Sequence, residues 1–215
     1  MKKIVYMAAA LLLTMAVTSC SKEDIGNTAT ESMAGEWYCT VDAVDESGNP
    51  IEGGEDYWGL AASTGNAKTR ILTYNTASND ASQLWVNILG IGNFAADYDN
   101  PDYPNYDFKI KTICNQSAMT FAATEAENIA DPVIWSHEEE DENGDTKEVI
   151  DAQVDPMPVT IEGKILKGAG RQNNGTPADS IIIYVTYKDD PWYPDDGYAK
   201  YKISGIRYSG LAEND

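Results

Sequence analysis

Histidine and cysteine are scarce in this sequence of 215 residues, and their scarcity limits the chemistry that the chain can perform. The single histidine is His137, and the three cysteines are Cys20, Cys39 and Cys114. Any Ser-His-Asp or Cys-His arrangement would have to use His137, but its acidic run, 137–141, is typical of a solvated hairpin. One histidine and two internal cysteines also match no spacing of zinc ligands. The sequence therefore predicts no metal site and no cofactor, and it marks no residue as catalytic.

Basic residues are also few, so the chain carries a strong negative charge. Lysine and arginine number 15 against 35 aspartates and glutamates, which gives a formal net charge of −20. Nucleic acids and anionic lipid surfaces are unfavourable partners for such a chain. A pair of carboxylates could in principle perform acid and base chemistry on a glycosidic bond. With so many acidic residues, however, the nearness of two of them in the sequence singles out no pair.

Long apolar runs are absent after residue 17, and the one run before it is typical of a secretory signal peptide. Two lysines, an apolar run over residues 4–17 and two small residues precede Cys20 in that order. A single membrane-spanning helix is the competing interpretation, but the run is shorter than the roughly 20 residues that a bilayer core needs. The end of the segment resembles the lipobox of bacterial lipoproteins, at which the signal, residues 1–19, is removed and Cys20 is lipidated. We therefore expect a lipid anchor at Cys20 that attaches the mature protein to a membrane.

The residues after Cys20 predict an address and a tether. Residues 21–24, Ser-Lys-Glu-Asp, resemble the short signal that sends many Bacteroidetes lipoproteins to the outer face of the outer membrane, and a solvated tether is the alternative. Residues 20–34 are polar and poor in aromatic side chains, so we expect a flexible spacer after the lipidated cysteine. The mature chain keeps 13 basic and 35 acidic residues, a net charge of −22. The predicted location is the outer membrane, at the cell surface or else at its periplasmic face.

Apolar and polar residues alternate with a period of two in many segments, and this pattern predicts β-strands. Trp37, Cys39 and Val41, for example, alternate with polar or half-polar neighbours. Further strands are expected over residues 69–77, 83–91, 108–112, 118–124, 133–138, 147–152, 161–165, 179–188 and 198–208. No long stretch keeps a helical period. We predict a single all-β domain over residues 35–215, an antiparallel up-and-down barrel of about eight strands, with a β-sandwich as the alternative.

Two predicted loops combine aromatic residues with prolines and acids. The segments 93–105 and 191–198 are expected to be irregular, and exposed aromatic rings beside acids and amides commonly stack on sugars or line a pocket. The alternative is that the rings pack the loops onto the end of the barrel. The aromatic residues in and beside these loops are Tyr98, Tyr103, Tyr106, Trp192, Tyr193 and Tyr198.

The start of the first predicted strand, Gly35-Glu36-Trp37, resembles the Gly-x-Trp motif of lipocalins. In that fold the tryptophan closes the floor of the barrel, and a basic residue, here Arg207, packs on the indole in a cation–π contact worth about 0.5 to 2 kcal/mol. The domain also resembles a family of Bacteroidetes lipoproteins labelled lipid-binding putative hydrolases. The segments that carry this resemblance are residues 35–38, 73–77 with Trp85, 161–165, 179–181 and 204–210. The resemblance implies a calycin-type barrel and an apolar ligand, and it supplies no catalytic residue.

A barrel of eight strands is just wide enough to fill its interior with side chains or to enclose one small ligand. If the interior is open, we predict that its wall includes Val41, Leu72, Tyr74, Phe108, Ile110, Ile183, Val185, Tyr201 and Ile203. The alternative is that these residues simply form the core. Cys39 and Cys114 could likewise form a disulfide or remain buried thiols.

Three functional hypotheses follow from the sequence. The first is a membrane-anchored lipoprotein that binds a small apolar or amphipathic ligand, such as a lipid, in its β-barrel. The second is a hydrolase that acts on a lipid or a glycan through carboxylates, for which deep clusters of acids with raised pKa values would be expected. The third is an accessory glycan-binding or assembly lipoprotein that uses the aromatic loops.

Overall fold

Ten β-strands make up the computed structural model of the protein, which describes residues 27–55, 57, 69–89, 104–141, 143–190 and 200–211. Within the part of the chain that the structure describes, we find no helical segment with the length and apolar character needed to span a bilayer. The strands are β1 (Gly35–Val44), β2 (Thr69–Asn75), β3 (Gln83–Leu89), β4 (Lys109–Asn115), β5 (Thr120–Ala126), β6 (Val133–Glu140), β7 (Thr146–Val154), β8 (Val159–Arg171), β9 (Pro177–Tyr187) and β10 (Lys200–Arg207).

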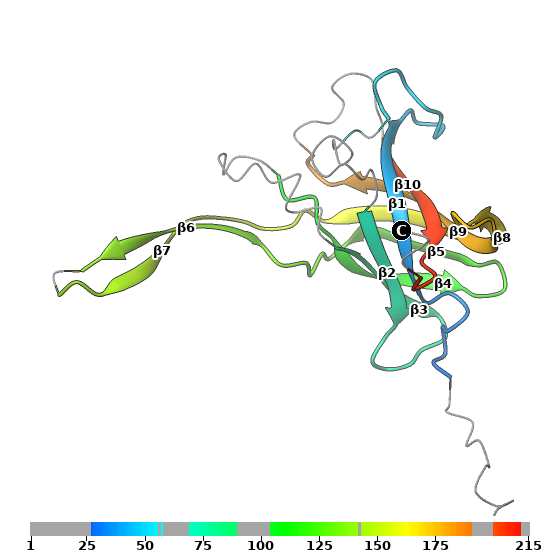
Figure 1. The fold of residues 1–215 in the computed structure, drawn as a ribbon, viewed down its shortest axis with the longest axis horizontal. Helices are drawn as coiled ribbons and strands as arrows, with labels where there is room; N and C mark the ends of the chain where they lie inside the picture. The colour runs from blue at the N-terminus through cyan, green and yellow to red at the C-terminus, as the bar shows by residue number, and fades with distance from the viewer. Residues whose placement is uncertain are drawn as a thin grey trace, which may run out of the picture.

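Eight of the strands close into one antiparallel barrel in the order β1-β10-β9-β8-β5-β4-β3-β2 (Figure 1). Neighbours in the barrel are also neighbours along the chain, with two exceptions: β5 and β8 pair across an inserted hairpin, and β1 and β10 pair to close the barrel. Because β1 pairs with both β2 and β10, this sheet has no free edge. The predicted up-and-down barrel of about eight strands is confirmed, and the β-sandwich alternative is wrong.

The strands alternate between buried and more exposed residues, as a sheet with one inner face requires. Trp37, Cys39 and Val41 on β1 are fully buried, and their neighbours are partly exposed. On the far wall, Gly163 of β8 lies opposite Phe121 of β5, and a Cβ atom at Gly163 would overlap the Phe121 ring. The absence of a side chain on β8 therefore makes room for a large ring in the core.

The two ends of the barrel differ. At one end, which we call the floor end, β1 begins at Gly35 and β10 finishes at Arg207; at the other, the loop end, β1 finishes and β10 begins. A short turn before β1 covers the floor end, with Thr30 and Met33 fully buried. The backbone oxygen of Met33 accepts a 2.7 Å hydrogen bond from the hydroxyl of Thr73. The flexible spacer predicted over residues 20–34 is therefore too long, because its last residues pack on the barrel.

Arg207 is the centre of the contacts at the floor end. Its guanidinium carbon lies 4.4 Å from the ring centroid of Trp37, and it donates a hydrogen bond to the backbone oxygen of Ala34. The carboxylate of Asp179 lies 3.4 Å from the Arg207 Nε and accepts a 2.9 Å hydrogen bond from Lys167. These contacts join β1, β8, β9 and β10 to the turn that precedes β1.

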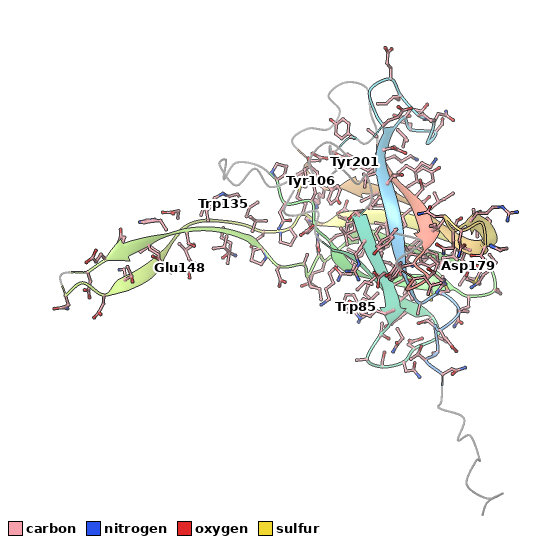
Figure 2. All side chains as sticks on the ribbon, viewed as in Figure 1. Trp85, Tyr106, Trp135, Glu148, Asp179 and Tyr201 are labelled. Carbon is pink, nitrogen blue, oxygen red and sulfur yellow. The ribbon has the colours of Figure 1, made fainter. Side chains whose placement is uncertain are left out.

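The two remaining strands, β6 and β7, form a hairpin that projects away from the barrel (Figure 1). Its side chains are mostly exposed, including Ile134 and Ile150, and Figure 2 shows Trp135 and Glu148 standing out along it. The solvated hairpin expected at the acidic run 137–141 is thus formed by strands longer than the predicted 133–138 and 147–152, and it inserts between two barrel strands without belonging to the barrel.

Cys39 and Cys114 are both free and buried, which decides between the two alternatives left open by the sequence. Burial raises the pKa of both thiols, and the nearby charge of Asp80 raises that of Cys114 further. Both groups therefore remain protonated and behave as small apolar side chains of the core.

Asp179 gives the floor end a predictable dependence on pH. Burial alone would raise the pKa of this carboxyl, but hydrogen bonds from Lys167 and from the backbone of Gly168, with the charge of Arg207, hold it below its ordinary value of 3.8. Asp179 therefore contributes fully to the free energy of unfolding at pH values above its ordinary pKa. This contribution is lost as the pH falls through the lowered pKa of the folded state.

We expect Asp179→Asn to lower the free energy of unfolding by about 1 kcal/mol near neutral pH, because Arg207 and Lys167 lose their charged acceptor. Urea unfolding followed by tryptophan fluorescence at neutral and strongly acidic pH measures the difference from the unsubstituted protein. The difference should shrink in acid. A constant difference at both pH values would contradict the proposed ion pairing.

Candidate functional site

Seven of the nine residues predicted to line an open interior do face the inside of the barrel. They are Val41, Phe108, Ile110, Ile183, Val185, Tyr201 and Ile203, and each is at most 1% exposed. A side chain without exposed surface leaves no space beside it for a water-sized molecule. These residues instead pack against one another and against Trp37 in a single hydrophobic core. An interior ligand would have to displace side chains, so their contact with a ligand stays a prediction.

Leu72 and Tyr74 do not face the interior, and the expectation that they do is wrong. The inward residues of β2 are Ile71 and Thr73, both nearly fully buried. The indole nitrogen of Trp37 donates a 2.9 Å hydrogen bond to the hydroxyl of Thr73, which places Thr73 on the inner face. Because side chains alternate along a strand, Leu72 and Tyr74 then point outward.

A cluster of tyrosines around one carboxylate occupies the interior near the loop end. Asp190 is 8% exposed and accepts hydrogen bonds of 2.7 Å and 3.1 Å from the hydroxyls of Tyr106 and Tyr201, which Figure 2 shows close together. Tyr187 donates a 2.7 Å hydrogen bond to the backbone oxygen of Tyr106, and its ring packs on Phe108 with centroids 6.3 Å apart. Burial first, and then the charges of Asp107 and Asp190, raise the pKa of Tyr187 well above 10. These polar groups are thus hydrogen-bonded to one another, on the loop-end side of the apolar core.

The aromatic loops lie mostly outside the described residues. Tyr98, Tyr103, Trp192, Tyr193 and Tyr198 all fall there, so their predicted role in binding sugars stays a prediction. Tyr106 is described and is 3% exposed, so it packs the barrel rather than presenting a ring to solvent. The strand ends that flank both loops lie at the loop end of the barrel.

A groove with a volume of about 710 Å³ lies on the outer wall of the barrel. Its lining is mostly apolar and comes from strands β4, β5, β8 and β9. Cross-strand pairing arranges the outward side chains in two rows. The first row is Ile113, Ala122, Glu162 and Tyr184, and the second row, nearer the floor end, is Asn115, Thr120, Lys164 and Ile182. This volume is within the range of about 300 to 1,000 Å³ that is usual for sites of small ligands.

Small side chains create the groove. Ala122 stands between the larger side chains of Ile113 and Glu162, which pair with it from the two neighbouring strands. Ile113 rises beside it with 66% of its surface exposed. A smaller hollow of about 180 Å³ shares Glu162 and Tyr184 with the groove and extends toward Lys200. Most residues that line this second hollow are polar, so the apolar surface belongs to the larger groove.

The described acids and His137 do not form the deep catalytic cluster that the hydrolase hypothesis requires. Hydrogen bonds lower the pKa of Asp45, Asp80 and Asp141, which therefore stay ionised. His137 lies on the exposed hairpin, where its Nδ1 is 2.8 Å from Asp151, and hydrogen bonds to Asp151 and Glu139 raise its pKa. Among the described residues, no three His, Cys, Asp or Glu side chains are grouped closely enough to hold a metal ion.

Sequence reasoning missed the groove, although two signals for it are present. Residues 181–183 are three consecutive isoleucines, so this strand is apolar on both faces, and Ile113 interrupts the polar outer face of β4. A strand that is apolar on both faces indicates contacts on both sides of the sheet. Which outward residues become neighbours depends on the pairing of four strands, which the sequence does not display.

Comparison with known proteins identifies the family of the chain. The chain matches the family described as "Lipid-binding putative hydrolase" over residues 22–212, which is nearly the whole length that follows the predicted lipidation site. A search of curated proteins found no match. Since the match covers far more than half of the sequence, the chain belongs to the family of lipid-binding putative hydrolases.

Proposed function

We propose that this protein is a lipoprotein, anchored in the outer membrane through Cys20, that binds one amphipathic lipid molecule in the groove on its outer wall. The observation that carries the proposal is the apolar groove of about 710 Å³, found on a barrel whose own side chains pack its described interior. The family description, which names lipid binding, supports the class of ligand. No described residue favours the hydrolytic part of that description.

The groove alone would give a lipid chain only weak affinity. Complete burial of about ten methylenes contributes on the order of 8 kcal/mol before the cost of immobilising the ligand. A groove covers a chain from one side, so about half of this value, roughly 4 kcal/mol, is realistic, and after the cost of immobilisation the chain alone would bind more weakly than about 1 mM. We therefore expect the head group of the ligand to add to the affinity of the chain.

The anchor would hold the floor end of the barrel toward the membrane. The first described residue is Asn27, and the turn that follows it packs on the floor end. Six residues lie between Cys20 and Asn27, and the seven steps from Cα to Cα reach at most about 25 Å in an extended chain. The groove on the side wall would then be within reach of lipids that leave or enter the membrane. Residues 21–24 support a position on the cell surface, and the periplasmic face is the alternative.

We expect Ala122→Glu to weaken the binding of a fluorescent fatty acid, cis-parinaric acid, by about tenfold or more. The bound acyl chain would partly desolvate a carboxylate placed at the bottom of the groove. The measurement is a fluorescence titration of the mature chain carrying Cys20→Ala, which removes the anchor. The side chain of Ala122 is exposed, so the fold should be unaffected.

Ala77→Glu provides the matched control, since Ala77 is an exposed alanine in the turn between β2 and β3, on strands that do not line the groove. It adds the same charge and should leave binding unchanged. If both variants bind the fatty acid as tightly as the parent, the ligand does not occupy the groove, and a site inside the barrel would be favoured instead.

We expect Cys20→Ala to release the protein from membranes, because the acyl chains would have no attachment site. Cells grown with an alkyne-bearing fatty acid and then fractionated provide the measurement: the parent should be labelled and sediment with the outer membrane, and the variant should be unlabelled and soluble. Cys39→Ala, which alters a buried core thiol, should remain labelled and membrane-bound. Membrane attachment of unlabelled Cys20→Ala would contradict the anchor.

A further inference from the structure

One corner of the groove is lined by hydrogen-bond donors. Asn115, Thr120 and Lys164 are consecutive members of the second row, one on each of β4, β5 and β8. Directly paired residues in a sheet have Cβ atoms about 4.5 to 5.5 Å apart, so the three side chains are close neighbours. The first row beside them is apolar at Ile113 and Ala122. This corner therefore combines a polar end with an apolar path.

The orientation of Asn115 leaves its amide nitrogen available. Its side-chain oxygen accepts hydrogen bonds of 2.8 Å from the hydroxyl of Ser117 and 3.1 Å from the backbone nitrogen of Ala118. A backbone N–H can only donate, so the atom that accepts from it must be the amide oxygen. The NH₂ group of Asn115 has no acceptor among the described residues, and it remains a donor for a ligand.

Lys164 provides a positive charge at the same corner. Of the eleven described lysines and arginines, five form ion pairs with carboxylates, and Lys164 is among the other six; the five are Arg70, Lys147, Lys167, Lys188 and Arg207. Lys164 has no such partner in the part of the chain that the structure describes, although the mature chain is strongly acidic. Its methylene stem can lie along the apolar groove while the ammonium group faces the polar corner.

We propose that the groove binds a free fatty acid, with the carboxylate at Asn115, Thr120 and Lys164 and the chain along Ile113 and Ala122. This inference rests on the proposed function, since it names the head group of the lipid held in the groove. A carboxylate accepts several hydrogen bonds and carries a single charge, which matches one lysine and two neutral donors. Glu162 lies next to Lys164 along β8, and its negative charge disfavours a doubly charged phosphate.

The test compares lipids that share one chain and differ in the head group. Laurate, the neutral monolauroylglycerol and the doubly charged lauryl phosphate are titrated by calorimetry into the mature chain carrying Cys20→Ala. Laurate should bind about tenfold more tightly than monolauroylglycerol, as expected for one charge-assisted hydrogen-bonding site. Lauryl phosphate should bind more weakly than laurate. Tighter binding of lauryl phosphate would overturn the assignment of a carboxylate.

Three variants examine Lys164 itself. Lys164→Gln should weaken laurate binding about tenfold and leave monolauroylglycerol unchanged. Lys164→Arg keeps the charge and should retain most of the preference for laurate. Lys111→Gln is the matched control, because Lys111 is exposed on β4 and lies 5.3 Å from the Trp85 ring rather than in the lining of the groove.

The outcomes separate the two proposals. If Lys164→Gln changes the binding of both lipids equally or of neither, the head-group inference is wrong. If monolauroylglycerol still binds in that case, and Ala122→Glu still weakens its binding, the proposed function stands without the head-group inference. If neither lipid binds the parent protein, both the proposed function and the head-group inference fail.

Discussion

The packing of inward side chains across a closed barrel is the interaction on which the rest of the structure depends. The barrel strands bury residues of one face, and Trp37, Phe108 and Tyr201 are the largest fully buried side chains of the core. Closure removes every free edge of the main sheet, so the barrel is stabilised by both backbone pairing and a shared core. This core leaves no water-sized space beside its fully buried members, whereas the described residues form a hollow of ligand size on the outer surface of the barrel.

The outer groove and the inner core have a common origin in β5 and β8. Phe121 packs inward over Gly163, where a side chain would overlap its ring. On the outer face of β5, Ala122 and Thr120 have small side chains. The large inward residue of β5 thus helps to fill the barrel, and the small outward residues of the same strand leave room for the groove. If the groove holds the lipid, as proposed, a filled barrel is compatible with membership of a family named for lipid binding.

Much of the fold could be predicted because the alternation of apolar and polar residues is a local property. All ten strands occur where the pattern indicated them, and Trp37 and Arg207 meet at the floor end. The alternation was ambiguous on β2, where Ile71, Leu72 and Tyr74 put apolar residues on both faces. There the inner face is decided by the hydrogen bond from Trp37 to Thr73, a contact between residues distant in sequence.

The candidate site could not be predicted because it exists only after four strands have paired. Ile113, Ala122, Glu162 and Tyr184 are spread over more than 70 positions of the chain, and their adjacency follows from the register of β4, β5, β8 and β9. The inserted hairpin of β6 and β7 further hides the pairing of β5 with β8. Periodicity can assign a residue to the outside of a barrel, but it cannot say which outward residues become neighbours.

A crystal structure of the protein with bound laurate tests the central claim most directly. The account predicts electron density for the chain along Ile113 and Ala122 on the outer wall, with Trp37 and Phe108 still packed inside the barrel. Density for the chain within the barrel, accompanied by displacement of those core side chains, would contradict it.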